Sequence, residues 1–396
     1  MNVDNYLNAW AASYRESLTN DILPFWLRHG LDRQNGGVYT CVNRDGSLID
    51  STKSVWFQGR FGFITSYAYN HIEKNPEWLA ASKSCIDFIE QHCTDTDGRM
   101  FFEVTADGRP LRKRRYVFSE TFAAIAMSGY AIASGDELYA RKALDLFGRI
   151  RHYLNTPGIL EPKYLPTLQA RGHSVTMILI NTASRIREAI QAPELDAQID
   201  ESIDAIRRCF GHPEFEALLE MVGPEGEFID TCNGRLINPG HCIETSWFLL
   251  EEARHRNWEK GLTELALQIL DWSWKWGWDE QYGGIINFRD CRHLPVQDYS
   301  QDMKFWWPQT ETIIASLYAY LATKDEKYLE MHKRVSDWTY AHFPDKEYGE
   351  WYGYLHRDGT IAQPAKGNIF KGPFHIPRMM MYGYGLCQDI LSVEGR

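Results

Sequence analysis

Several familiar signals are absent from this chain of 396 residues. No apolar run reaches the roughly 18 residues of a membrane-spanning helix, and no basic-then-apolar segment opens the chain, so we expect neither a membrane anchor nor a secretion signal. No CxxC pair and no zinc-ligand spacing occurs, so a metal-binding module is not expected. Neither Gly-rich phosphate pattern, GxGxxG or GxxxxGK[ST], is present, which argues against the common nucleotide-binding folds.

The chain also has fewer basic residues than acidic ones. The formal net charge is −11 and the pI is near 5.7. An acidic surface repels phosphate backbones, so nucleic acid is not an expected partner. The eight cysteines are scattered along the chain, and we interpret them as reduced thiols of a cytoplasmic protein.

What the sequence does contain is an internal repeat built on glycine turns. Five segments combine a glycine turn, alternating apolar residues and a second turn: residues 35–47, 97–109, 225–235, 282–292 and 348–359. This pattern predicts short β-hairpins. A sixth member, near residues 156–166, has turn residues but no clear hairpin pattern.

Helical patterns fill the space between the turns. Residues 119–134, 243–256 and 310–322 have apolar side chains at i, i+3, i+4 and i+7. Residues 122–133 are apolar on several faces, which is typical of a buried helix, whereas residues 78–92 are two-faced, as expected of an outer helix.

Six repeats of about 60 residues, with two helices each, predict an all-α fold, an (α/α)6 barrel of six helical hairpins with short β-hairpins in the connecting loops. An open solenoid is the alternative, but its inner helices would be too apolar to face water. No linker or charge run divides the chain, so residues 1–396 are predicted to form a single catalytic domain.

The start of each predicted inner helix carries aromatic and polar residues. Equivalent positions of a closed barrel converge on one mouth, and a concave aromatic wall with polar groups suits a sugar. The residues predicted to form this mouth are Trp56, Arg60, Glu120, His173, Asn181, His241, Glu244, Trp247, Trp306, Trp307, Gln309, Glu311, Phe374, His375 and Arg378.

Two histidines stand out among these residues. His241 and His375 each lie at a helix start after a Gly or Pro turn, among small or apolar neighbours, so they are candidate catalytic groups. The alternative is that each caps a helix or is a buried structural histidine. Glu244 follows His241 by one helical turn and could orient it or serve as a structural partner.

Four segments resemble a known family. The strings RLINPGHCIETSWF, MKFWWPQTE, EYGEWYGYLHRDG and FKGPFHIPRMM closely resemble the N-acylglucosamine 2-epimerases, the family that includes mammalian renin-binding protein. The resemblance runs from about residue 23 to the C-terminus and implies the same (α/α)6 barrel. It also implies that His241 and His375 are catalytic, supported by Arg60, Glu244 and Glu311.

The resemblance carries further expectations. Mammalian relatives are activated by ATP, which for this chain implies an allosteric ligand at most; the protein could also form a homodimer. Ahead of Glu311, the family often has His or Ser where this chain has Gln309 and Thr310. Relatives that act on unmodified sugars carry a histidine in the helix that begins near His173.

The residues of the mouth suit epimerisation at C2 of a ring-opened sugar, here N-acetylglucosamine and N-acetylmannosamine. Histidine can act as acid or base near neutrality, and Arg60 can neutralise an oxyanion, so neither metal nor cofactor is required. Rival hypotheses on the same barrel are a mannose-isomerase-type aldose–ketose isomerase and a cellobiose 2-epimerase. A glycoside hydrolase using Glu120, Glu244 or Glu311, and a non-catalytic sugar- or protein-binding barrel, are also open.

Overall fold

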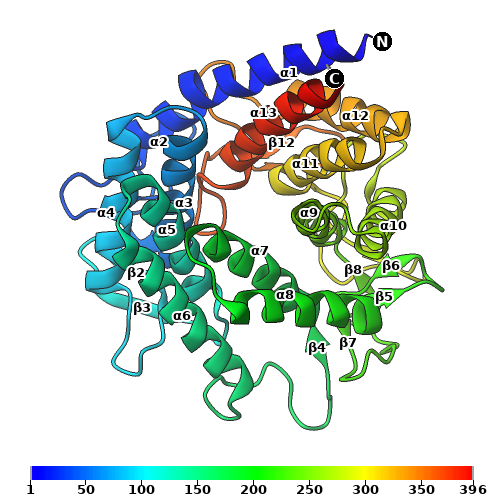
Figure 1. The fold of residues 1–396 in the computed structure, drawn as a ribbon, viewed down its shortest axis with the longest axis horizontal. Coiled ribbons are helices and arrows are strands. Elements are labelled where there is room, and N and C mark those ends of the chain that lie inside the picture. Colours follow the sequence, from blue (N-terminus) through cyan, green and yellow to red (C-terminus); the bar gives the residue numbers. More distant parts are fainter. Residues whose placement is uncertain (1, 395–396) are drawn as a thin grey trace.

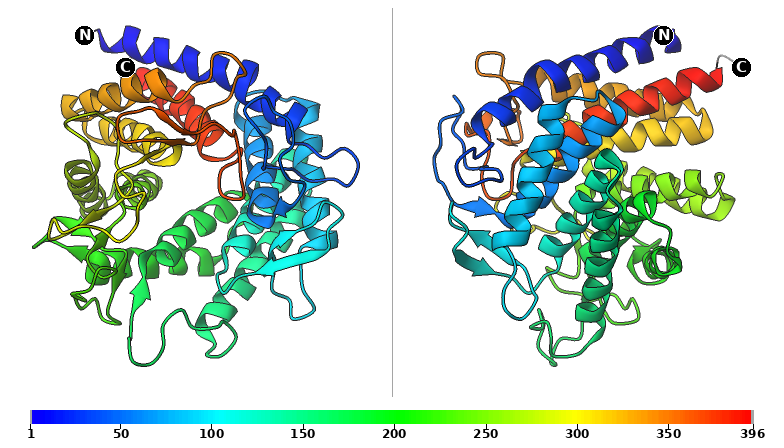
Figure 2. Two further views of the ribbon diagram at one scale, coloured as in Figure 1. Left: turned by 180° about the vertical axis from the view of Figure 1, so that it is seen from behind. Right: turned by 60° about the vertical axis from the view of Figure 1, so that its left-hand side comes forward.

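The computed structural model describes residues 2–394, in which helices are arranged as a closed double ring (Figures 1 and 2). The inner helices are α3 (Val55–His71), α5 (Phe118–Ser134), α7 (His173–Ala189), α9 (Pro239–His255), α11 (Trp306–Thr323) and α13 (His375–Glu394). Their outer partners are α4 (Pro76–His92), α6 (Glu137–Asn155), α8 (Pro193–Ala205), α10 (Lys260–Gly277), α12 (Glu326–His342) and α1 (Val3–Ser17). The predicted (α/α)6 barrel is confirmed.

The two ends of the chain close the ring. The sixth helix pair is not a consecutive hairpin: it joins α1, the first helix, to α13, the last. These helices lie side by side, blue and red, in Figure 1. A π-helical turn, η1 (Leu18–Ile22), and α2 (Leu23–His29) then lead into the first complete unit, and a second such turn, η2 (Ile206–Phe210), follows α8.

The inner helices differ from the outer ones in how much of their surface is buried, and small residues let them pack closely. Helix α5 is buried around almost its whole circumference, whereas α6 buries only one stripe. Small residues let the inner helices approach closely: a Cβ added to Gly59 of α3 would lie 2.4 Å from the backbone carbon of Phe122. Among the described residues, no helix is both long and apolar enough to cross a membrane.

Short strands join the ends of four of the helix pairs at one end of the barrel. They are β1 (Lys53–Ser54), β2 (Phe101–Val104), β3 (Pro110–Lys113), β4 (Arg171–Gly172), β5 (Gly211–His212), β6 (Ala217–Leu218), β7 (Met221–Val222), β8 (Leu236–Ile237), β9 (Arg289–Asp290), β10 (Lys304–Phe305), β11 (Tyr354–Leu355) and β12 (Ile361–Gln363). In four units, the strand that enters the inner helix pairs antiparallel with a strand beyond the outer helix of the same unit: β1–β2, β4–β7, β8–β9 and β10–β11.

This pairing corrects part of the hairpin prediction. Residues 225–235 and 282–292 do not form hairpins of their own; instead β8, after the first segment, pairs with β9, inside the second. Residues 35–47 contribute only isolated bridges, whereas β2–β3 and β11–β12 are true hairpins. Alternation of apolar residues indicates a strand but does not say which strand it pairs with, because that choice depends on how the helices bring the ends together.

Buried lysines anchor the glycine turns to these strands. The ammonium group of Lys53 donates to the Asp32 carboxylate (2.7 Å) and to the carbonyl of Gly36 (2.7 Å). In a later unit, Lys304 donates in the same way to Asp279 (3.0 Å) and to the carbonyl of Gly283 (2.6 Å). Each turn is therefore held against the start of an inner helix, which fixes the surface from which the site is built.

Candidate active site

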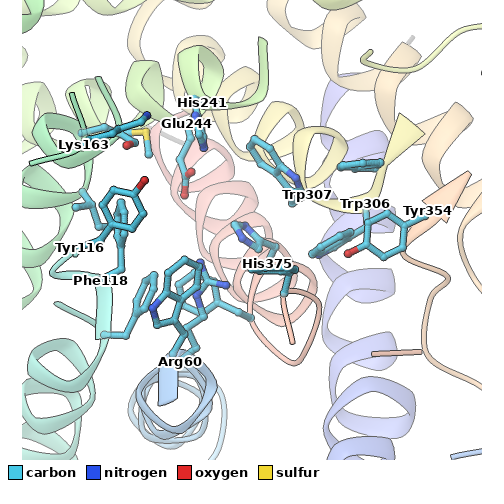
Figure 3. A pocket seen from close by; sticks show the side chains of 18 residues that line it. Arg60, Tyr116, Phe118, Lys163, His241, Glu244, Trp306, Trp307, Tyr354 and His375 are labelled. Carbon is cyan, nitrogen blue, oxygen red and sulfur yellow. The ribbon is translucent and has the colours of Figure 1, made fainter. Parts of the chain in front are cut away.

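A pocket of about 540 Å³ lies where the inner helices begin (Figure 3). Every inner helix contributes residues from its first turns, because the strand that precedes each helix points the helix start toward the axis. The lining residues are Trp56, Arg60, Tyr116, Phe118, Phe122, Lys163, Ser174, Met177, Ile178, His241, Glu244, Phe305, Trp306, Trp307, Tyr354, Phe370, Phe374 and His375.

The pocket has a charged half and an apolar half. The sixth residue of α3, α9 and α11 is charged: Arg60, Glu244 and Glu311. The sixth residue of α7 is Ile178, and the neighbouring helix α5 presents Phe122. Helices α3, α9 and α13 therefore supply the pocket with Arg60, Glu244 and His375, while α5 and α7 supply mainly apolar side chains.

His375 is held as a neutral base. Its Nδ1 lies 2.8 Å from Oε1 of Glu311, so we assign Nδ1–H as the donor, which leaves the Nε2 lone pair for the pocket. Burial, together with the adjacent positive charge of Arg378, places the pKa of His375 well below its usual value. The imidazole is therefore uncharged near neutrality and can accept a proton.

The surroundings of His241 shift its pKa in the opposite direction. Its Nδ1 lies 3.0 Å from Oε1 of Glu220, and its side chain keeps 28% of its surface exposed. Burial opposes the charged form, but the carboxylates of Glu220 and Glu244 outweigh that effect and raise the pKa of His241. The ring of Trp307 packs against both imidazoles, with centroids 5.2 Å from His241 and 5.9 Å from His375. An acid and a base thus share one pocket.

A fixed cation bridges the carboxylates beneath the two histidines. Arg378 donates to Glu244 and, at 2.7 Å, to Oε2 of Glu311, which also accepts from the indole of Trp247 at 2.8 Å. The side chains of Glu244, Glu311 and His375 offer three potential metal ligands within 4.8 Å of one another. The guanidinium already satisfies both carboxylates, so this donor set fits an arginine better than a metal ion.

Arg60 is placed to receive developing negative charge. Its guanidinium carbon lies 4.2 Å from the ring centre of Phe122 and 4.7 Å from that of Phe374. Burial lowers the pKa of Arg60 to about 9, although Glu244 opposes the shift. Within residues 2–394, Arg60 has no ion pair, and its buried Nε has no hydrogen-bond partner. Its charge is therefore available to a ligand.

Several predicted residues lie outside the pocket lining. Glu120 is buried against Arg99 (2.8 Å) and the backbone N–H of Met100 (3.0 Å). Gln309 binds the backbone N–H and C=O of Ile285 at 2.7 and 2.8 Å. His173, Asn181 and Trp247 are buried behind the wall, as are Glu311 and Arg378. Residues that lie close together in one sequence motif therefore do not all line the pocket, because some of them are buried in the connections between strands and helices.

The structure also adds residues that the sequence pattern does not identify. Tyr116, Phe118, Lys163, Tyr354 and Phe370 line the pocket from helix starts and loops. Glu220 contacts His241 from the segment between β6 and β7. The sequence gives only a weak indication of Glu220, which is the one acidic residue within the apolar run ALLEMV, residues 217–222. A carboxylate in such a run needs a partner.

Comparisons with known proteins show the family and the fold of this chain. The sequence model of the family described as N-acylglucosamine 2-epimerase matches residues 37–373. The chain is 34% identical to the N-acylglucosamine 2-epimerase of Bos taurus over 395 residues, covering 98% of this chain and 92% of that protein. For the Homo sapiens enzyme the identity is 32% over 399 residues, covering 98% and 91%. The cellobiose 2-epimerase structure from Bacillus thermoamylovorans shares the fold, with a TM-score of 0.85, 21% identity and coverage of 96% and 99%.

Proposed function

We propose that this chain, which belongs to the N-acylglucosamine 2-epimerase family, interconverts N-acetylglucosamine and N-acetylmannosamine by proton transfer between His375 and His241. The observation that carries the proposal is that two imidazoles line one pocket, each bonded through Nδ1 to a different carboxylate, in surroundings that shift their pKa values in opposite directions. Paired groups whose environments separate their pKa values are suited to acid and base roles in one reaction.

The proposed reaction assigns one proton transfer to each of the two histidines. The sugar ring first opens: the anomeric hydroxyl proton moves to the ring oxygen as the C1–O5 bond breaks, leaving an aldehyde that acidifies C2. Nε2 of His375 removes the C2 proton, the C–H electrons form a C1–C2 double bond, and the carbonyl electrons move to O1. Arg60 offsets the charge on this enolate oxygen. The O1 electrons then re-form the carbonyl while the C1–C2 π electrons take the Nε2 proton of His241 on the opposite face of C2, and the ring closes; the reverse reaction exchanges the two roles.

The apolar half of the pocket supports an N-acylated substrate. Phe118, Phe122, Met177 and Ile178 provide hydrocarbon on the side away from the arginine–carboxylate cluster. An acetamido methyl group gains free energy from such surface, whereas a hydroxyl group on an unmodified sugar loses hydrogen bonds with water there. An N-acylated C2 also cannot become a ketose by returning the proton to C1, which separates this proposal from an aldose–ketose isomerase.

A substrate panel in D2O, followed by proton NMR, tests the proposal. We expect N-acetylmannosamine to give N-acetylglucosamine with deuterium at C2, in the presence of a chelator, because the cluster around Arg378 already contains its cation. Mannose and cellobiose should react more slowly. Loss of turnover on chelation with recovery on adding zinc or manganese, formation of a ketose, or binding without turnover or exchange would each contradict the proposal.

The same proposal includes the cellular location, the domain organisation, the oligomeric state and the allosteric ligand of the protein. All eight cysteines are free thiols, which supports a cytoplasmic location, and closure of the ring by α1 and α13 supports a single catalytic domain over residues 1–396. Family membership supports a homodimer and ATP as an allosteric ligand. ATP takes part in no step of this chemistry.

A further inference from the structure

We propose that Glu220 is a positioning residue for this reaction, holding His241 with its Nδ1–H engaged and its Nε2–H directed at the substrate. The inference rests on the proposed function for its kinetic consequences, but its structural part can be measured without substrate. It assigns a role to a carboxylate that does not itself line the pocket.

The contacts of Glu220 define that role. Its Oε1 lies 3.0 Å from Nδ1 of His241 and 3.8 Å from Nδ1 of His173, and 16% of its side chain is exposed. Its backbone is fixed on both sides: its N–H donates to the carbonyl of Leu236 (3.0 Å), and its carbonyl accepts from the N–H of His173 (3.1 Å). The carboxylate is therefore held rigidly behind His241.

His173 lies on the other side of the carboxylate. The hydroxyl of Thr245 donates to the backbone carbonyl of His241 (2.8 Å), so it accepts from Nε2–H of His173 (3.1 Å). The Nδ1 atom of His173 has no hydrogen-bond partner and faces Glu220. A proton on this atom would complete an imidazole–carboxylate–imidazole chain, in which Glu220 balances positive charge on either ring.

The surroundings argue against a merely space-filling role. The neighbours of Glu220 along the chain, Ala217, Leu218, Leu219, Met221 and Val222, are buried and apolar. A carboxylate among them costs desolvation energy, which its two histidine contacts offset. An apolar residue would pack there without that cost, so the charge serves His241.

Other charges around the pocket also affect His241. They are Glu244 on its own helix, Glu311 from α11, His375 and Arg378 from α13, Arg60 from α3, Lys163 from the loop before β4, and His173 from α7. Glu220 is the carboxylate that bonds the imidazole directly. Removing its charge takes away the strongest local support for the protonated ring, and the pKa of His241 should fall.

The test is Glu220→Gln, which keeps the shape and an acceptor oxygen but removes the charge. We expect kcat to fall roughly tenfold or more, with KM changed less than about threefold, because the substitution lowers the fraction of His241 that is protonated near neutrality and leaves the groups that bind the substrate in place. The alkaline limb of the kcat profile should move down by about one pH unit or more. In the substrate-free protein, the His241 imidazole, assigned in NMR spectra by comparison with His241→Asn, should titrate at correspondingly lower pH.

Two variants serve as references. Glu220→Asp retains the charge and should restore part of the alkaline limb. Glu252→Gln removes a buried carboxylate that pairs with Arg187 and Arg256 near the far end of α9, and it should leave the pH profile unchanged. An unshifted His241 titration in Glu220→Gln, or an effect on KM alone, would overturn the inference. A wild-type protein without turnover would overturn the proposed function instead, and the titration would still decide the role of Glu220.

Discussion

At the scale of single residues, the site depends on how the neighbours of two histidines differ. Burial and the adjacent Arg378 lower the pKa of His375, whereas the carboxylates of Glu220 and Glu244 outweigh burial and raise the pKa of His241. A histidine has the same unperturbed pKa wherever it occurs, so its role is set by what lies within a few ångströms. The sequence predicts both histidines, but it does not predict which of them is neutral.

Replacing each histidine by asparagine tests this division of labour. His241→Asn and His375→Asn should both abolish net epimerisation, because asparagine retains some hydrogen bonding but is neither acid nor base near neutrality. Each variant keeps one base and should still exchange the C2 proton of one epimer with D2O, and the two variants should favour opposite epimers. Proton NMR of both sugars measures this; exchange of the same epimer by both variants would require a single-base scheme.

At the scale of the elements, neighbouring positions at the start of an inner helix have separate tasks. In α11, Gln309 faces the strand side and bonds the backbone of Ile285, whereas Glu311, two residues on, bonds His375. In α3, Gln58 bonds both backbone groups of Val38 in the same way, and Arg60 lines the pocket. The repeat therefore alternates a residue that supports the turn with one that builds the site.

Gln309→Ala tests that separation. It leaves two buried backbone groups of Ile285 without partners, so the free energy of unfolding should fall by about 1–3 kcal/mol or more, while KM stays near that of the wild type. Urea denaturation and steady-state kinetics measure the two effects. Gln58→Ala should behave alike, and Gln191→Ala, which removes only a bond to the carbonyl of Arg187 in the last turn of α7, should cost much less. A raised KM with unchanged stability would instead place Gln309 at the substrate.

At the scale of the whole molecule, stability depends on closing the ring with α1. Tyr6 and Tyr14 of α1 bond the two ring nitrogens of His332 in α12, at 2.7 and 2.9 Å. His332 is fully buried, and burial lowers its pKa to about 3. The contact between the first helix and the rest of the barrel therefore contains a histidine that the folded protein keeps neutral.

This histidine makes closure sensitive to acid. The pKa of His332 is lower in the folded protein than in the unfolded chain. Its contribution to the free energy of unfolding is therefore fully present above the unfolded pKa of roughly 6.5 and is lost as the pH falls toward 3. The loss is about 1.4 kcal/mol per unit of pKa difference, up to several kcal/mol in all. Unfolding free energies measured from pH 7 to 4 should fall steeply in the wild type. His332→Gln should be less stable at pH 7 but have a flatter dependence, whereas the exposed His255→Gln should retain the wild-type slope. Equal slopes in all three proteins would contradict this account.

The sequence by itself determined the barrel, the family and eight of the residues that line the pocket. Periodicity and repeat length depend only on local chain geometry, so the buried helix 122–133, the glycine turns and the helix starts at His241 and His375 could be predicted directly. A helix start that recurs in every unit must also lie near its equivalents once the ring closes.

Only the tertiary structure decided what surrounds each of these residues. It paired β8 with β9, joined α1 to α13, and removed Glu120 and Gln309 from the pocket lining. It also brought Glu220, some twenty residues before His241 in the chain, within 3.0 Å of that imidazole. Strand partners, burial and pKa values depend on contacts between segments far apart in sequence, and no local pattern contains them.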